Sequence, residues 1–250
     1  MSRAQVKWAL NAASFAREAL GFPADEAQER LLEGSPRRVV LNCTRQWGKS
    51  TVTAAKAVHH AYFHEGSLTL VMSPSLRQSG EFVRKAGDFL GKLGIRRRGD
   101  GDNGTSLLLP NGSRIVGLPG NETTVRGFSK VGLLILDEAA RVGDALYHSL
   151  RPAQAVADGA LWLMSTPNGK RGFFHGVWER GGEEWERVAI PATQCPRISR
   201  RFLEEQRATM GERWFRQEYL CEFTDAEDQV FSGEAIEGAM TDEVEPLRVW

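Results

Sequence analysis

The feature that most constrains the fold of this chain is the segment Cys43-Thr44-Arg45-Gln46-Trp47-Gly48-Lys49-Ser50-Thr51. The β-branched run 38–42 before it predicts a buried strand, and residues 49–64 after it predict a helix. A turn between a strand and a helix presents backbone N–H groups at the positive end of the helix dipole, where phosphate binds. The sequence therefore predicts a phosphate-binding loop, and a chance Gly-Lys-Ser at a helix start is the alternative.

We expect all nine residues of this loop to form the binding site for the phosphates, largely through their backbone. Lys49 should reach the terminal phosphates, and Ser50 should place its hydroxyl on Mg²⁺. Arg45 is a second candidate for phosphate contact. Cys43 stands where the usual pattern has its first glycine, so the strict motif fails by one residue. Glycine is favoured there for its backbone freedom, and Cys43 therefore implies a conformation open to an L-residue.

Two carboxylates, Asp137 and Glu138, follow the apolar run 133–136. Such a run is typical of a strand covered on both faces, as in a parallel sheet. At its carboxyl end, Asp137 would hold Mg²⁺ and Glu138 would orient and deprotonate the attacking water. Alone, an apolar run ending in acids is a common strand end. Combined with the loop, it predicts an ATPase, because the Asp-x-x-Gly that signalling GTPases carry at this point is absent from the sequence.

A third polar segment, Ser165-Thr166-Pro167-Asn168-Gly169, ends the apolar run 160–164. Ser165 and Thr166 would lie beside the γ-phosphate and could respond to its loss. A Pro-Asn-Gly turn that merely ends a strand is the alternative.

Strand and helix patterns alternate along most of the chain, which favours an α/β fold with a mainly parallel sheet. Asn111-Gly112 between two apolar runs predicts a hairpin. We expect strands at 38–42, 68–73, 107–110, 113–118, 132–136, 160–164 and 185–190. We expect helices over the first twenty residues, around Gln28, and at 49–64, 76–93, 171–180, 199–210 and 212–220.

Composition narrows the class of protein. The chain has 250 residues, of which 41% are hydrophobic and 26% charged, close to a globular average. It contains no apolar run near the ~18 residues of a membrane span and no apolar signal segment at its start. Three cysteines without metal-like spacing fit a reducing compartment. The net charge of zero hides a basic body, because residues 222–250 carry nine acids and one base. A basic body permits a polyanionic partner.

Taken together, the loop, residues 135–140, the turn at 165–169 and the late segment Phe215-Arg216-Gln217-Glu218-Tyr219 with Glu222-Phe223 resemble the ATPase domain of the large terminase subunit of tailed bacteriophages. The resemblance runs from about residue 22 to residue 232. That family packages DNA into preformed capsids. The resemblance implies a P-loop NTPase of the ASCE type, with a mainly parallel central sheet flanked by helices and a C-terminal lid or linker subdomain.

The resemblance also implies roles for single residues. Phe22-Pro23 and Gln28 are similar to the adenine-reading segment of the family, and an exposed helix position is the alternative for Gln28. Arg126 lies in a segment similar to the one that carries a trans-acting arginine finger, and Arg45 is its rival. The implied cofactors are ATP and Mg²⁺. The implied partners are double-stranded DNA, the portal protein and the small terminase subunit. The chain is expected to form a homo-oligomeric ring of five on a capsid portal. The expected location is the cytoplasm of the infected bacterial host, away from membranes.

We expect an ATPase domain over residues 1–222, with an N-terminal helical and adenine-binding segment at 1–34, and an acidic lid or linker over 223–250. The nuclease domain usual in the family is expected to be absent, and Asp225, Glu227 and Asp228 are interpreted as solvated acids. Candidate DNA contacts are Arg96-Arg97-Arg98 and Arg200-Arg201. The alternatives are a helicase-like or other DNA-dependent ATPase, and a nucleotide-binding docking module without turnover.

Overall fold

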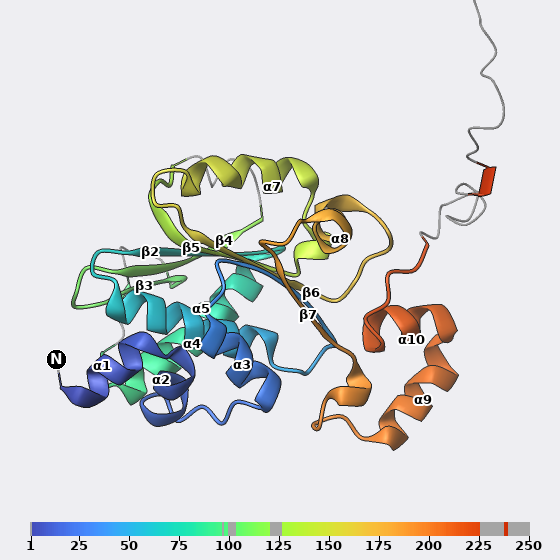
Figure 1. Cartoon of the computed structure of the whole chain (residues 1–250), viewed down its shortest axis with the longest axis horizontal. Helices are drawn as coiled ribbons and strands as arrows, with labels where there is room; N and C mark the ends of the chain where they lie inside the picture. The colour runs from blue at the N-terminus through green and yellow to red at the C-terminus, as the bar shows by residue number, and fades with distance from the viewer. Residues whose placement is uncertain (1, 97, 100–103, 121–126, 226–237, 240–250) are drawn as a thin grey trace, which may run out of the picture.

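A central sheet with helices on both faces organises the chain in the computed structural model, which describes residues 2–96, 98–99, 104–120, 127–225 and 238–239. Helices α1 to α5 cover one face of the sheet, and α7 and α8 cover the other (Figure 1). Helices α9 and α10 stand together beside the sheet, past its β7 edge. The predicted α/β class is therefore confirmed.

Seven strands in the described residues form one sheet, in the order β3-β4-β2-β5-β6-β1-β7. All neighbouring strands are parallel except β3 and β4, which form the antiparallel hairpin predicted around Asn111-Gly112. The strands are β1 (Arg38–Cys43), β2 (Leu68–Ser73), β3 (Ser106–Leu108), β4 (Arg114–Pro119), β5 (Val131–Asp137), β6 (Ala160–Ser165) and β7 (Glu186–Ile190).

The helices agree with the predicted ranges at most positions. They are α1 (Arg3–Leu10), α2 (Ala12–Glu18), α3 (Glu26–Gly34), α4 (Lys49–Phe63), α5 (Leu76–Lys92), α7 (Asp144–Leu150), α8 (Gly172–Arg180), α9 (Arg200–Met210) and α10 (Glu212–Tyr219). None of the helices in the described part of the chain combines the length and apolar character that crossing a bilayer requires.

One helical prediction was wrong, and one helix was not predicted. The first twenty residues form two helices, because Asn11 adopts an extended backbone and its side chain caps α2 by accepting from the Ser14 N–H. Asparagine competes with a helix in this way through local side-chain bonds. Helix α7 was not predicted. It has only seven residues, and its buried contacts come from Leu146 and Leu150, which is too few positions to display a period.

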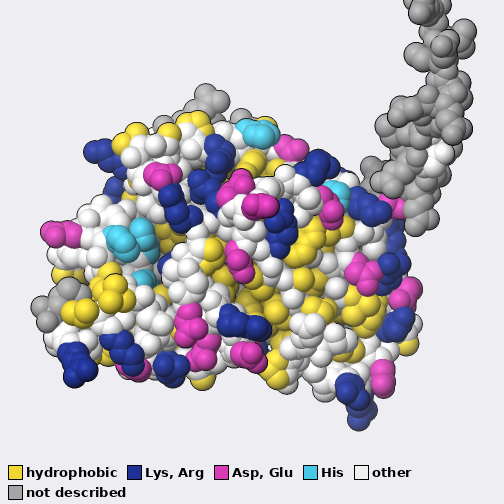
Figure 2. All heavy atoms as spheres, viewed as in Figure 1, with side chains coloured by type: hydrophobic (Ala, Val, Ile, Leu, Met, Phe, Trp, Pro, Cys, Tyr) yellow, Lys and Arg dark blue, Asp and Glu magenta, His cyan; other side chains and the backbone are white. Residues whose placement is uncertain are grey.

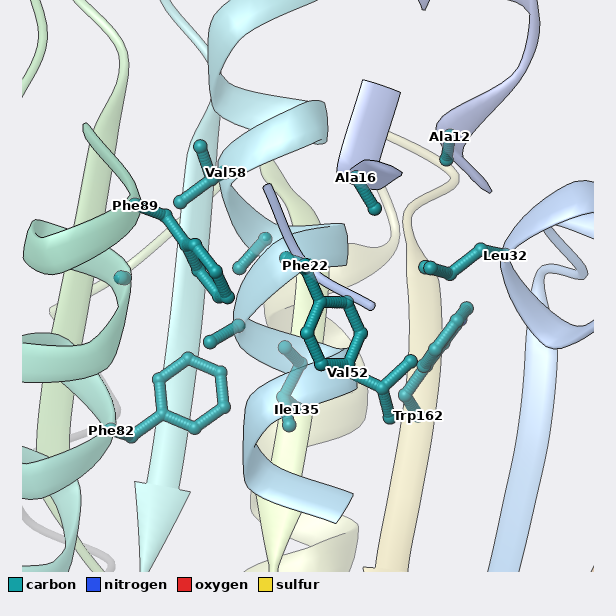
Figure 3. Close-up of a cluster of buried hydrophobic side chains, with 14 of the residues drawn as sticks. Ala12, Ala16, Phe22, Leu32, Val52, Val58, Phe82, Phe89, Ile135 and Trp162 are labelled. Carbon is teal, nitrogen blue, oxygen red and sulfur yellow. The ribbon is translucent and has the colours of Figure 1, made fainter. Parts of the chain in front are cut away.

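The core is divided by the sheet into two apolar layers. The larger layer lies under α1 to α5, where Phe82 and Phe89 of α5, Val52 of α4, and Ile135 and Trp162 of the sheet meet (Figure 3). The second layer lies under α7 and α8. Strands β1, β5 and β6 are buried on both faces, which explains their uninterrupted apolar sequences. This packing fixes their carboxyl ends, where the polar motifs begin.

Candidate nucleotide-binding site

A cavity of about 740 Å³ opens at the carboxyl edge of the sheet. Its volume lies within the usual range for small-molecule sites. The phosphate loop, the start of α5 and the end of β5 contribute to its walls. The side chains around it include six bases, Arg45, Lys49, Arg77, Lys85, Arg141 and Arg197, and three acids, Glu81, Asp137 and Glu138. The excess of positive charge suits a polyphosphate.

The strand order brings the three predicted motifs to this edge. Strand β6 lies between β1 and β5, so that Asn42 pairs with Ser165 and Asp137 pairs with Met164. Parallel strands end on the same side of a sheet, so the phosphate loop, the Ser165-Thr166 turn and the Asp137-Glu138 pair lie next to one another. This arrangement is the one expected of an ASCE-type P-loop protein.

The loop backbone leads directly into α4. Gly48 has φ of 95°, a left-handed conformation that glycine adopts without a steric cost, and Gln46 is also left-handed with φ of 66°. Gly48 caps α4 without any side-chain hydrogen bond. The first N–H groups of a helix have no partner inside the helix, so an uncapped start can bind an anion. The ammonium of Lys49 donates to the carbonyls of Cys43, at 2.6 Å, and Thr44, at 3.1 Å.

Three loop residues turn their side chains away from the cavity. Cys43, Thr44 and Trp47 are buried, whereas Arg45, Gln46 and Gly48 through Thr51 line the cavity. Cys43 has no positive φ, as expected for an L-residue at this position, and its thiol lies 3.7 Å from the Val188 carbonyl. Any part these three play in binding would therefore come from their backbone.

Gln28 is fully buried, so the alternative of an exposed helix position is wrong. Its amide oxygen accepts from the Asp25 N–H at 3.1 Å, and its amide nitrogen donates to the Trp47 carbonyl at 2.8 Å. Gln28 thus ties α3 to the phosphate loop. Each end of the amide has already formed one bond, and the adenine-reading role stays a prediction.

The two carboxylates at the end of β5 differ in environment. Asp137 is 8% exposed and accepts the Glu138 N–H at 3.0 Å. Burial, together with the neighbouring Glu138 charge, raises the pKa of Asp137 to about 6. Glu138 has φ of 51°, a left-handed backbone that is costly for a residue with a Cβ. Strain of this kind is found where a side chain must be aimed, and it turns Glu138 toward Arg141.

Arg141 joins the carboxylate of Glu138 to helix α10. One guanidinium nitrogen donates to Glu138 Oε2 at 2.9 Å and to Thr166 Oγ1 at 3.2 Å. The other donates to Glu218 Oε1 at 2.8 Å. Glu218 also accepts from Arg45 Nε at 2.9 Å and from the Thr166 hydroxyl at 3.2 Å. Two bases and two acids therefore form one neutral network.

This network includes two residues that the sequence analysis did not assign. Glu218 is 7% exposed, and a buried carboxylate is costly unless it is paired, as it is here. The sequence signals were faint. Arg141 follows Glu138 at a distance of three residues, and Glu218 belongs to the late segment that carried the resemblance. Arg45, predicted to contact phosphate, lines the cavity and pairs with Glu218 through Nε. Ser165 and Thr166 are buried beside Arg141.

The donor set at this edge fits Mg²⁺. This ion keeps several waters and takes one or two carboxylates together with phosphate oxygens. Ser50 and Asp137 both line the cavity and supply one hydroxyl and one carboxylate. No cluster of three or more histidine, cysteine or acidic side chains suited to a metal occurs among the described residues. One hydroxyl and one carboxylate suit a metal that also binds phosphate oxygens.

Four predicted positions need separate mention. Arg126, the expected arginine finger, lies outside the described residues, as do Glu227 and Asp228. Asp225 was interpreted as solvated, and this was wrong. Its carboxylate pairs with Lys170 at 3.2 Å, and its carbonyl accepts from Arg213 at 2.7 Å. These contacts anchor the segment that follows α10.

Comparison with known families decides the identity of this fold. Residues 40–237 match the family described as "Terminase large subunit, T4likevirus-type, N-terminal". The chain belongs to this terminase family. The match contains the whole phosphate loop, both carboxylates and the Arg141–Glu218 pair. The resemblance inferred from the motifs is confirmed.

Individual terminases are similar over most of this chain. It is 25% identical to the terminase large subunit of Thermus phage G20c over 256 aligned residues, which are 86% of this chain and 52% of that protein. It is 27% identical to the terminase large subunit of Escherichia phage T5 over 213 residues, 80% of this chain and 47% of that protein. The terminase chain thus spans about half the length of these curated relatives.

Solved terminases share the fold. The ATPase domain of the Thermus phage P74-26 large terminase superposes with a TM-score of 0.73 at 20% identity, covering 86% of this chain and all of that domain. The HK97 large terminase gives a TM-score of 0.71 at 17% identity, with coverages of 89% and 56%. The large terminase of another thermophilic bacteriophage, in complex with ADP, gives 0.66 at 12% identity, with coverages of 89% and 53%. At these identities the likeness concerns the fold.

Proposed function

We propose that this chain is an ATP-hydrolysing motor unit that drives translocation of double-stranded viral DNA into a capsid. One observation carries the proposal. Lys49, Asp137 and Glu138 line the same basic cavity, with Thr166 linked to Glu138 through Arg141. A protein that only bound nucleotide would have no need of a strained glutamate at that position. The family to which the chain belongs supports the packaging role.

The residues divide the chemistry between them. When ATP binds, Lys49 donates to the terminal phosphates in place of the Cys43 and Thr44 carbonyls. The free N–H groups at the uncapped start of α4 donate to neighbouring phosphate oxygens. Ser50 and Asp137 would hold Mg²⁺, which would neutralise charge on the phosphate oxygens. Glu138 takes a proton from the attacking water. Thr166 reports loss of the γ-phosphate through Arg141 to Glu218 on α10.

Several finer assignments belong to the same proposal. Gln28 reads the adenine edge, and Arg126 enters the cavity of a neighbouring copy in a five-membered ring on the capsid portal, in the cytoplasm of the infected host. The small terminase subunit and the portal protein are its protein partners. DNA binding uses exposed bases such as Arg200 and Arg201. Contacts of arginine with phosphates would not depend on base sequence. On the face shown in Figure 2, basic and acidic side chains are interspersed, so such contacts there would come from single bases.

A steady-state phosphate-release assay with and without double-stranded DNA tests the proposal. We expect magnesium-dependent release of phosphate from ATP that DNA accelerates, and none from the matched variant Glu138→Gln. Hydrolysis that single-stranded nucleic acid alone stimulates would support the helicase-like alternative. Tight ATP binding without turnover, in protein assembled as an oligomer, would support the docking module and contradict the proposal.

A further inference from the structure

One wall of the nucleotide cavity is formed by helix α5. Arg77, Glu81 and Lys85 of this helix all line the cavity. Residues four apart are neighbours on a helix surface, so these three side chains form one row along α5. None of the proposed steps of ATP hydrolysis uses this row.

Three of the six bases around the cavity are already paired with acids. Arg45 and Arg141 both donate to Glu218, at 2.9 and 2.8 Å. Arg197 pairs with Asp25 at 3.2 Å. The charge of these three arginines is therefore partly balanced before any ligand binds. A polyphosphate in this cavity needs further cations.

Lys85 supplies such a cation from the α5 row. The neighbouring carboxylate of Glu81 is bonded to Arg84 instead, at 3.1 and 2.5 Å. Within the part of the chain that the structure describes, neither Lys85 nor Arg77 forms a hydrogen bond or an ion pair. Arg77 is exposed, whereas Lys85 is half-buried. Partial burial strengthens the interaction of a charge with a ligand, so Lys85 is the stronger candidate.

The strand order places α5 at the end of the cavity where Asp137 lies. Strand β2, which leads into α5, is next to β5 in the sheet, and Met72 pairs with Leu136. Burial raises the pKa of Asp137 to about 6, and the nearby positive charges of Lys49 and Lys85 oppose this rise. Lys85 therefore acts on the same end of the cavity as the carboxylate expected to bind Mg²⁺.

The other end of the cavity lies on the β7 side of the phosphate loop. Arg197 follows β7, and its Nη2 would be 3.9 Å from a Cβ placed on Gly48. Strands β2 and β7 lie on opposite sides of β5, β6 and β1. Asp137 and Glu138 define the end at which phosphate is hydrolysed. The nucleoside of ATP should therefore extend toward Arg197, with its terminal phosphate facing α5.

We propose that Lys85 donates to the γ-phosphate of bound ATP and makes the site prefer ATP to ADP. Lys49 approaches the phosphates from the loop, and Lys85 approaches the last of them from α5. ADP has no oxygens at that position, so it does not use Lys85. This assignment rests on the proposed ATPase function, because that function fixes which end of the cavity receives the γ-phosphate.

Equilibrium binding of ATP and of ADP, each with Mg²⁺, to the non-hydrolysing variant Glu138→Gln tests the proposal. Adding Lys85→Met, which removes the charge and keeps a flexible apolar side chain, should weaken ATP binding about 10- to 100-fold, as expected for the loss of a charged hydrogen bond. ADP affinity should stay the same. The matched control Lys92→Met, at an exposed position of α5 outside the cavity, should change neither affinity.

A second variant separates a lost contact from damage to the helix. Lys85→Arg keeps the positive charge and should retain most of the preference for ATP. Equal weakening of ATP and ADP by Lys85→Met, or no change in either, would overturn the proposal and leave the ATPase function standing. Unchanged nucleotide affinities with a loss of stimulation by DNA would also overturn it and assign Lys85 to DNA. Failure of the Glu138→Gln protein to bind either nucleotide would contradict the ATPase function itself.

Discussion

Pairing of charged side chains explains how Glu138 is positioned at the level of single residues. Its carboxylate accepts from Arg141, whose second nitrogen is held by Glu218. Because Glu218 shares the positive charge of Arg141, the guanidinium orients Glu138 without neutralising it fully. Glu138 is thereby held in the wall of the nucleotide cavity.

Substitutions of Lys49 and Glu138 should separate binding from hydrolysis. Lys49→Ala removes the main cation of the loop, so ATP affinity should fall by about 10- to 100-fold, as expected for the loss of a charged hydrogen bond. Glu138→Ala removes only the activation of water and should retain affinity while losing about 10²–10⁴-fold in turnover. Titration of both variants with a fluorescent ATP analogue, beside a phosphate-release assay, measures the two effects. Wild-type turnover by Glu138→Ala would end its assignment as the base.

Replacing Cys43 with a smaller side chain should leave most of the activity intact. Its backbone lies outside the left-handed region, and its thiol is buried among apolar side chains, away from the cavity. Cys43→Ala should keep most of the turnover and lose about 1–2 kcal/mol of unfolding free energy, because it leaves a small void. Urea denaturation and the phosphate-release assay measure both effects. Loss of activity with an unchanged urea denaturation curve would show that the thiol has a chemical role.

At the scale of helices and strands, the sequence predicted local patterns and missed contacts between distant segments. The strand at 133–136 and the helix after Gly48 were predictable because apolar runs and glycine act locally. The pairing of Arg45 with Glu218 was not predicted, because Glu218 is 173 residues away in the sequence. Only the folded sheet brings these side chains together. The burial of Gln28 could not be predicted for the same reason.

Helix α10 should depend on Glu218 for its attachment to the site. Glu218→Gln leaves Arg45 and Arg141 with less compensating charge, so we expect a loss of about 1–3 kcal/mol of unfolding free energy, moderated by the exposure of Arg45. Arg141 should then bind Glu138 more tightly and lower kcat more than it changes KM. The matched control is Glu222→Gln, which breaks a surface pair with Arg216 and should cost less than about 1 kcal/mol. Equal effects of the two variants in urea denaturation would contradict this role.

Across the whole molecule, buried histidines should make the fold sensitive to acid. Burial lowers the pKa of His59 to about 4 and that of His60 to about 3, against 6.5 for an unfolded chain. The unfolded chain therefore takes up protons first, so stability is full above pH 6.5 and falls as the pH drops toward 4. At pH 5 each histidine should cost about 2 kcal/mol.

Asp137 opposes this trend, since its raised pKa favours the fold as pH falls from about 6 toward 3.8. Denaturation at pH 7 and pH 5 should still show the net loss. The double variant His59→Gln, His60→Gln should show a smaller difference between the two pH values. An unchanged difference would mean that these rings do not titrate as their burial requires.

The arrangement of several chains is tested most sharply by mixing two inactive variants. An arginine inserted at the transferring phosphate is worth about 10³–10⁵ in rate. If Arg126 acts on a neighbouring chain, the Arg126→Ala variant has a competent nucleotide pocket but supplies no arginine to its neighbour. The Glu138→Ala variant has an inactive pocket but still supplies Arg126 to its neighbour. Mixtures under assembling conditions should therefore recover part of the hydrolysis, at interfaces where an intact Arg126 meets an intact Glu138. Recovery should depend on protein concentration, because dilution separates the chains. Light scattering should show that the two variants co-assemble. If the co-assembled mixture recovers no phosphate release, Arg126 does not have this role. An arginine of the same chain, such as Arg45, would then be the cation that acts on the phosphate.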